Sequence, residues 1–503
     1  MSYVCDVHTV VISDLHLSEA HEPEDRRPLW MAYKRREHFI DEDFAAFLEH
    51  TVGESDGPVE LVLNGDIFDF DNVTQLPDEV PEGGRVDWLA KLRGLGSEEW
   101  MSAFKMERII ADHPLWFSAL RDFIRQGHRA VFVIGNHDLE LGWPSVKKLV
   151  RAALEVEPED ERVTFCAWFY LSESDTYITH GHLYDPNCAV TDPIDPVIEV
   201  HGRPRMRIPF GDLAGRYMLN GMGYFNPHAS DNYIMSGMEY MRFFFRYMLL
   251  TQPLLLWSWF WSALVTLFIS LRDHWRPAMR DPLRVEEKVA SVADASRATP
   301  SMVRKLAALN VPSSCTSPMW VLRELWLDRG FLFLGILALA WQVVLHVNIA
   351  WPISPLWVFA ALAVLIPPYL VYAARVKSTV FQMPLLDEER AELIHRITGA
   401  TTVVMGHTHQ PVSSEIGPVR YLNGGFWSPA FSNPECTDRL GTQSFVWIRP
   451  DEDGDRRAEL YEWAPGATAA RVFQLAERDV EDDRPSTKRP SVSPPRLEPG
   501  RAA

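Results

Sequence analysis

The chain has 503 residues, of which 47% are hydrophobic and 23% are charged, so most of it has the composition of a folded protein. Its 49 Lys and Arg residues against 68 Asp and Glu residues give a net charge of −19. Sequence-independent binding to nucleic acid requires a basic surface, so we expect no nucleic-acid partner. The cysteines form no CxxC pair, which favours reduced thiols. They are Cys5, Cys166, Cys188, Cys315 and Cys436.

Apolar runs of strand length alternate with helical patterns in the first part of the chain and return near its end. The first residues lead directly into such a run, so we expect no signal peptide. We predict helices over 37–50 and 99–126 and a loop over 76–98. The predicted strands are 8–13, 59–64, 129–134, 175–179, 401–405, 419–423, 442–449 and 457–463. This alternation predicts a layered α/β fold.

A long insertion interrupts the pattern and contains three uncharged apolar runs. These runs, at 247–271, 331–351 and 355–374, approach the roughly 20 residues that cross a bilayer. The alternative is a set of buried helices in a soluble core. Tryptophans gather in or beside the runs, as in the aromatic belts of membrane proteins. They are Trp257, Trp259, Trp261, Trp341, Trp351 and Trp357. We therefore predict an inserted α-helical membrane region.

The position of the insertion limits its topology, because the strands on either side belong to one domain and must lie on the same side of the membrane. The Pro-containing turn at 352–355 predicts that 331–351 and 355–374 form a hairpin. Arg246 precedes and Arg272 follows the first run, which favours the cytoplasm for both flanks. We predict that 243–271 is re-entrant or lies in the interface rather than crossing.

These observations divide the chain into four parts. Residues 1–185 and 384–473 are predicted to form one domain in two pieces, and 186–383 is the insertion between them. The Pro-rich and charged tail, 474–503, is predicted to be disordered.

Five blocks of His, Asp and Asn residues follow predicted strands, where α/β folds place their sites. Carboxylate, imidazole and amide oxygen together suit Mn, Fe, Zn or Mg. Glycines beside these residues allow the backbone to turn tightly. Each block alone is weak, but the five in order predict a two-metal site, which suits phosphoester hydrolysis. The blocks are Asp14-Leu15-His16, Gly65-Asp66-Ile67-Phe68-Asp69, Gly135-Asn136-His137-Asp138, His180-Gly181-His182 and Gly406-His407-Thr408-His409.

In these blocks the chain resembles the calcineurin-like metallophosphoesterases, whose pattern is DxH, GDxxD, GNH[DE], a later H and GHxH. The resemblance covers about 1–185 and 385–463 and implies a four-layer β-sandwich flanked by helices. It implies one metal held by Asp14, His16, Asp66 and His409. It implies a second metal held by Asp66, Asn136, His180 and His407, with Asp66 as the bridge.

The resemblance also implies the reaction, in which a metal-bridging hydroxide attacks phosphorus. His137 would be the general acid or a phosphate binder, and Asp69 would orient it. We expect Asp138 and His182 to shape the loops. Phe70 stands where the Ser/Thr protein phosphatases have Arg, which argues against a protein phosphatase.

The residues of the blocks most resemble those of bacterial UDP-2,3-diacylglucosamine pyrophosphohydrolases, which are membrane-associated and commonly use Mn. Two features depart from that group: His137 stands where its best-known members have Arg, and the insertion is much longer. We expect a membrane-bound hydrolase of a phosphodiester or pyrophosphate in a phospholipid-like or lipid-linked substrate, at the cytoplasmic face of a bacterial-type inner membrane. The alternatives are a membrane-anchored phosphodiesterase of a soluble nucleotide-like substrate and a non-catalytic metal-binding sensor.

The insertion begins and ends beside the predicted site, and its residues 205–240 are rich in Met, aromatic and Gly residues. Met-rich surfaces adapt to apolar ligands. Two interpretations of this stretch stay open: a cap that receives acyl chains, or a segment that packs the insertion against the domain.

Overall fold

The first sheet has four parallel strands on one side and three antiparallel strands on the other. In this computed structural model its order is β14-β13-β12-β1-β2-β3-β4. The parallel strands are β1 (His8–Ile12), β2 (Val59–Asn64), β3 (Arg129–Val133) and β4 (Val163–Cys166). The antiparallel strands are β12 (Gln443–Pro450), β13 (Arg456–Trp463) and β14 (Arg471–Val472).

The second sheet joins strands from both sides of the insertion, in the order β10-β11-β9-β6-β5. Its strands are β5 (Phe169–Ser172), β6 (Thr176–Thr179), β9 (Thr402–Met405), β10 (Pro411–Ile416) and β11 (Val419–Gly424). β6 and β9 pair in parallel, with Ile178 opposite Val404. The residues that follow these two strands therefore emerge at the same edge.

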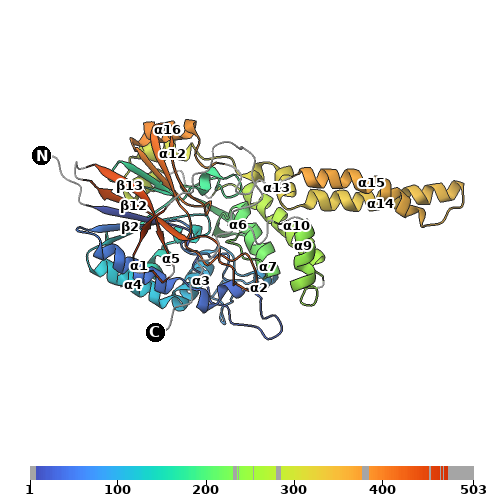
Figure 1. The fold of residues 1–503 in the computed structure, drawn as a ribbon, viewed down its shortest axis with the longest axis horizontal. Helices are drawn as coiled ribbons and strands as arrows, with labels where there is room; N and C mark the ends of the chain where they lie inside the picture. The colour runs from blue at the N-terminus through green and yellow to red at the C-terminus, as the bar shows by residue number, and fades with distance from the viewer. Residues whose placement is uncertain are drawn as a thin grey trace, which may run out of the picture. The chain divides into compact units, whose positions relative to one another are not determined.

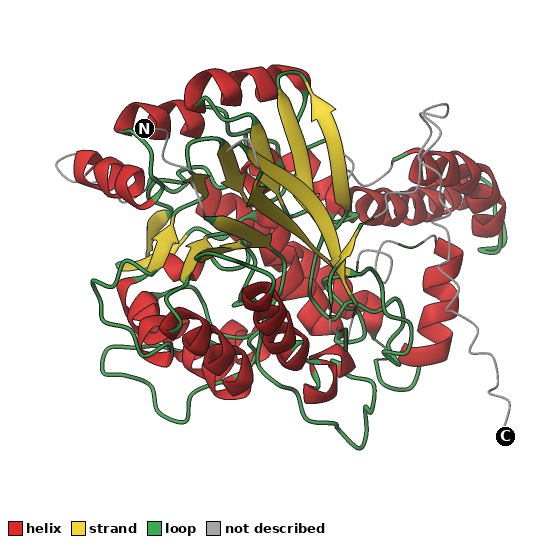
Figure 2. Ribbon diagram, turned by 60° about the vertical axis from the view of Figure 1, so that its left-hand side comes forward, coloured by secondary structure: helices red, strands yellow, loops and turns green. Residues whose placement is uncertain are grey.

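The two sheets pack face to face through a core of small and branched side chains, including Val62 and Val131 from the first sheet and Ile178, Val404 and Leu422 from the second. Helices cover the outer faces (Figures 1 and 2). On one side lie α1 (Asp41–Gly53), α3 (Glu99–Asp112), α4 (Pro114–Arg125) and α5 (Pro144–Ala153). On the other lie α12 (Pro300–Ala307) and α16 (Glu388–Thr398). The architecture is that of mixed sheets flanked by helices.

The structure describes residues 7–229, 235, 237–252, 254–278, 285–376, 384–451, 455–464, 466–467 and 469–473. Residues Met1–Phe473 form one compact unit. The tail, 474–503, lies outside the described residues, and so does its predicted disorder.

The predicted strands are all found, with ends that differ by at most one residue. The predicted helix at 99–126 is two helices, α3 and α4, because Pro114 cannot continue the hydrogen-bonding pattern of the helix before it. The predicted loop at 76–98 contains a short helix, α2 (Trp88–Arg93), which Asp87 caps. The strands that the sequence did not predict are β4, β5, β10 and β14, together with β7 (Val197–Val200) and β8 (Arg203–Met206).

The insertion begins with β7 and β8 and continues through short helices that pack against the sheets. These are α6 (Phe210–Ala214), the π-helical turn η5 (Gly215–Leu219) and α7 (Asn220–Met222). After them come α9 (Gly237–Phe243), the π-helical turn η6 (Phe244–Met248) and α10 (Leu255–His274). The first apolar run is thus not one continuous helix, because the chain turns between η6 and α10.

α10 has one buried side and one exposed side. Ala263 and Thr266 are fully buried, and Ala263 contributes to a core with Phe210 and Val321. The opposite side exposes a stripe of aromatic side chains, Trp257, Trp261, Phe268 and Trp275. Their spacing places all four on one face of the helix.

Two further helices of the insertion return to the sheets. α11 (Val285–Ala295) and α12 contribute Val289, Val303 and Leu306 to the core that also includes the sheet residues. The backbone N–H of Leu171 in β5 donates to the carbonyl of Ser296. The predicted boundaries, with 186–383 as one separate insertion, did not anticipate this return.

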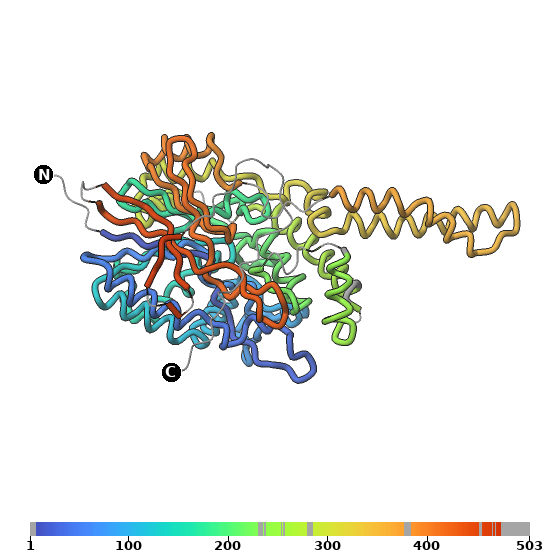
Figure 3. Tube along the Cα trace, in the orientation of Figure 1, coloured from blue at the N-terminus to red at the C-terminus, as the bar shows by residue number. Residues whose placement is uncertain are grey.

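The last part of the insertion is a pair of adjacent helices joined by a short turn. α13 (Pro318–Glu324) leads into α14 (Leu327–Ala350), and α15 (Trp357–Arg375) lies beside it (Figure 3). Among the described residues, these are the two helices long and apolar enough to cross a membrane, with hydropathies of 2.0 and 1.9. None of the side chains of α15 is buried.

Candidate metal centre

The five motif blocks meet at one edge of the sandwich, where β1, β2, β3, β6 and β9 end. Backbone hydrogen bonds join the loops: His16 N–H donates to the carbonyl of Asp66 (2.9 Å), and Gly406 N–H donates to the carbonyl of His180 (3.0 Å). The parallel pairing of β6 and β9 brings the fourth and fifth blocks together, although more than 200 residues of chain separate the two strands.

Asp14, His16 and His409 form a first group of potential metal ligands, whose donor atoms lie within 4.8 Å of one another. Nε2 of His409 is 3.2 Å from Oδ1 of Asp14 and 3.3 Å from Nε2 of His16. Burial and the nearby imidazoles of His228 and His137 lower the pKa of His16 well below its usual value. His16 is therefore neutral, as a metal ligand must be.

Asp66, His180 and His407 form a second such group. Nε2 of His180 is 3.0 Å from Oδ2 of Asp66, and its Nδ1 donates to the carbonyl of Asn64 (2.9 Å). This second bond fixes the ring so that Nε2 faces the site. Nε2 of His407 lies 3.0 Å from Oδ2 of Asp185, so this ring is held at Nε2 rather than at Nδ1.

Asn136 lies beside the second group and presents its amide oxygen. Its Nδ2 donates to Oδ1 of Asp212 (2.8 Å), whereas Oδ1 is buried and has no hydrogen-bond partner among the described residues. A buried polar atom without a partner costs free energy, and a bound cation would remove that cost. The position of Asn136 therefore fits the predicted ligand role.

The backbone at this edge is strained at five of the predicted ligands. These non-glycine residues have positive φ, a conformation that costs about 1–3 kcal/mol each and is concentrated at functional sites. They are Asp14 (58°), His16 (51°), Asp66 (53°), His407 (70°) and His409 (56°). The converging loops hold these side chains at the cost of backbone strain.

Glycines allow the loops to approach one another closely. Gly65 has φ of 80°, and a Cβ atom there would lie 2.5 Å from the ring of His180. A Cβ at Gly135 would lie 2.3 Å from Oδ1 of Asp66. Of these two glycines, only Gly65 adopts positive φ, whereas Gly135 is needed for space.

His137 lies at the opening of the site, between two carboxylates. Its Nδ1 is 3.4 Å from Oδ1 of Asp69, and its Nε2 is 3.3 Å from Oδ1 of Asp212. Burial favours the neutral ring, but the charges of Asp212, Asp69 and Asp66 outweigh it and raise the pKa of His137 well above its usual value. The side chain of His137 is 20% exposed, whereas Asp66 is 2% exposed, so a ligand from solvent can reach the imidazole.

The remaining motif residues support the loops. The carboxylate of Asp138 accepts hydrogen bonds from the backbone N–H groups of Gly135 (2.6 Å) and Ile67 (2.8 Å), which ties the second and third blocks together. Burial lowers the pKa of His182 well below its usual value, so its ring is neutral. These contacts are those expected of loop-shaping residues.

Three side chains at the site were not predicted from the sequence. Asp185 follows the His180 block, whereas Asp212 and His228 belong to the insertion. The ring of His228 stacks on that of His16, with centroids 4.0 Å apart, and its Nε2 is 3.4 Å from Oδ2 of Asp69. Asp212 and His228 lie within the stretch 205–240, for which both a cap and a packing segment were considered, but no motif spacing identified them.

Residues 7–204 match the family model described as calcineurin-like phosphoesterase. The protein is a metallophosphoesterase. The matched residues include the first four blocks of the metallophosphoesterase, up to His180, and the pairing of β6 with β9 adds His407 and His409 from beyond the match. No curated protein matches the chain.

The residues of the metallophosphoesterase fit a pair of divalent cations. Asp14, His16 and His409 would hold one, His180, His407 and Asn136 the other, and Asp66 lies where both groups meet. When bound, such ions polarise a phosphoryl group and lower the pKa of water. His137, supported by Asp69, can hold a proton near a leaving oxygen.

Proposed function

We propose that this metallophosphoesterase is a membrane-bound hydrolase that cleaves a phosphodiester or pyrophosphate bond in a phospholipid-like or lipid-linked substrate. The path of the chain around the site carries the proposal. The insertion leaves just after His180 and returns just before His407, on neighbouring strands. Between them it forms the exposed apolar hairpin of α14 and α15 and supplies Asp212 and His228 to the site. The site and the apolar hairpin thus belong to one compact unit.

The composition of the hairpin supports its place in a bilayer. α14 exposes large apolar side chains along its length, and α15 does the same. Exposed apolar surface on this scale marks a membrane or partner interface. At the open end of the hairpin, the Tyr372 hydroxyl donates to Asp328 (2.7 Å), so the first charged residues lie where the helices join the rest of the insertion.

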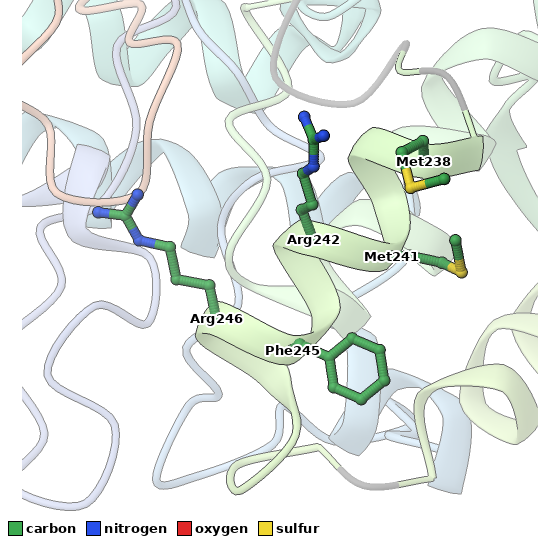
Figure 4. A pocket seen from close by; sticks show the side chains of 5 residues that line it. All are labelled: Met238, Met241, Arg242, Phe245 and Arg246. Atoms are coloured by element: carbon green, nitrogen blue, oxygen red, sulfur yellow. The ribbon is translucent and has the colours of Figure 1, made fainter.

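α9, η6 and α10 have the character of interfacial helices, which supports the predicted place of 243–271 at the membrane surface. An open hollow is lined by Met238, Met241, Arg242, Phe245 and Arg246. Its apolar side chains are exposed and point to one side of the helix, whereas the two arginines point to another (Figure 4). Together with the aromatic stripe of α10, this arrangement suits the boundary between acyl chains and anionic headgroups.

The return of α11 and α12 to the sheets supports a cytoplasmic location for both flanks of the first apolar run. We expect Ser301→Cys, at an exposed position of α12, to react with a membrane-impermeant thiol reagent only after cells are permeabilised. Ser354→Cys, in the exposed turn of the hairpin, is the matched control and should react in intact cells. Wild-type protein gives the background, because its described cysteines are buried or half-buried. Labelling of Ser301→Cys in intact cells would contradict the proposed topology.

A hairpin variant tests the lipid substrate. Replacement of 331–374 by a short Gly-Ser linker is feasible because the contact between Asp328 and Tyr372 in the wild type places the open ends of α14 and α15 side by side. In the proposed enzyme this variant loses at least about tenfold activity on lipid pyrophosphates and phosphodiesters in vesicles, since the apolar surface that holds it on the bilayer is removed. Activity on a small chromogenic phosphodiester stays within about twofold of wild type. Equal loss on both substrates would contradict the proposal.

The alternatives are separated by a substrate panel with full-length protein in detergent and added Mn²⁺. Hydrolysis of lipid phosphoesters supports the proposed function. Preference for soluble nucleotides supports a membrane-anchored phosphodiesterase. Metal binding without hydrolysis of any substrate supports a sensor.

A further inference from the structure

We propose that Asp212 is a positioning residue, through which the insertion sets the orientation of Asn136 and His137. The proposal goes beyond the proposed function, because it concerns the assembly of the metal centre and holds for any phosphoester substrate. Asp212 lies on α6, outside every motif block, and its side chain is fully buried.

One oxygen of Asp212 serves two neighbouring residues of the third block. Oδ1 accepts a hydrogen bond from Nδ2 of Asn136 (2.8 Å) and lies 3.3 Å from Nε2 of His137. Oδ2 is buried and has no hydrogen-bond partner among the described residues. The carboxylate therefore faces the site rather than a structural partner elsewhere in the insertion.

The contact with Asn136 decides which atom of the amide faces the metal centre. A cation binds the oxygen of an amide and is repelled by its NH₂ group. Because Nδ2 donates to Asp212, Oδ1 points away from Asp212 and is left without a protein partner. Without an acceptor at Asp212, nothing in this contact would favour the productive orientation over the flipped one.

The contact with His137 completes the support of the imidazole. Asp69, from the loop after β2, holds Nδ1, and Asp212, from the insertion, lies at Nε2. Two carboxylates at opposite nitrogens restrict both the tilt and the rotation of the ring. Orientation of this kind contributes to the rate because a misplaced proton donor is a poor catalyst.

The position of Asp212 is itself built by contacts with the phosphoesterase domain. Gly211 N–H donates to the carbonyl of Asn187 (2.8 Å). Arg216, one helical turn after Asp212, pairs with Asp71 (3.4 Å) and donates to the carbonyl of Gly94 (2.9 Å). Asp71 lies two residues after Asp69, so these contacts fix Asp212 relative to the site.

The test uses two substitutions that separate the effects. Asp212→Ala removes the acceptor and the charge, whereas Asp212→Asn keeps an oxygen acceptor for the amide of Asn136. The matched control is Asp273→Asn, another buried carboxylate of the insertion, which pairs with Arg205 and Arg272. Mn²⁺ binding to the full chain in detergent is measured by calorimetry without substrate, and thermal unfolding of the metal-free proteins is measured in parallel.

For Asp212→Ala we expect one of two Mn²⁺ binding steps to weaken about 10–100-fold, as for other residues that orient metal ligands, while the other step changes less than about threefold. Asp212→Asn should bind Mn²⁺ at both steps within about threefold of wild type, yet turn over a small chromogenic phosphodiester about tenfold more slowly. Wild-type Mn²⁺ affinity in Asp212→Ala would overturn the proposal. Equal weakening in Asp212→Asn and Asp212→Ala would also overturn it, and so would the same losses in Asp273→Asn. Each outcome is independent of whether lipids are the substrate.

Discussion

Replacement of Asp66 by Ala is expected to abolish turnover and to remove both metal ions. Asp66 is shared by the two groups of potential ligands: its donor atoms lie with His180 and His407 on one side and with His16 and His137 on the other. Without it, no carboxylate remains between the two metal positions to offset the repulsion of two cations. Loss of several kcal/mol of transition-state stabilisation corresponds to a decrease in kcat/KM of about 10³-fold or more.

The measurements are metal content after dialysis and kcat/KM on a soluble phosphodiester with added Mn²⁺. The metal-free variant should be less stable than metal-free wild type, because burial in the wild type is outweighed by the charges of His180 and His137, which hold the pKa of Asp66 well below its usual value. Asp56→Ala, which removes an exposed carboxylate outside the site, should leave metal content and kcat/KM unchanged. Two bound ions in an inactive Asp66→Ala variant would show that Asp66 does not bridge them.

Local sequence patterns were sufficient to predict the strands that carry the site. Each strand is a short apolar run that ends in a polar block, and parallel strands bring their ends to one edge. The pairing of β6 with β9 could not be predicted in this way, because it joins residues separated by the whole insertion. The short strands β4 and β5 were missed because neither ends in a motif block, whereas β6 and β9, which are equally short, are followed by the His180 and His407 blocks.

The site residues that belong to the insertion could not be predicted from sequence patterns. Asp212 has no fixed spacing from any block, and it reaches His137 only because α6, η5 and α7 pack beside Asp71. His228 was equally hidden, since its role depends on stacking with His16. The first apolar run is broken between η6 and α10, and its apolar pattern alone could not locate that break.

Substitution of His137 by Ala is expected to reduce kcat about 10²–10⁴-fold while both metal ions stay bound, since this is the usual contribution of a positioned general acid. The two ring nitrogens of His137 face Asp69 and Asp212. The side chain of His137 is 20% exposed, compared with 17% for His409 and 5% or less for His180, His228 and His407. His137 also lies close enough to His16 and Asp66 to act as a ligand. Metal content therefore decides between the two roles, and loss of an ion from His137→Ala would favour the ligand role.

The dependence on the leaving group gives a second, independent measurement. A general acid matters most when the leaving oxygen is basic, because a weakly basic oxygen departs without a proton. The defect of His137→Ala should therefore be at least about tenfold larger for an alkyl or phenyl phosphodiester than for a nitrophenyl one. His182→Ala, which removes a buried neutral imidazole beside His180, is the matched control and should show no such difference. An equal defect on all leaving groups would show that His137 binds the phosphoryl group instead of protonating the leaving oxygen.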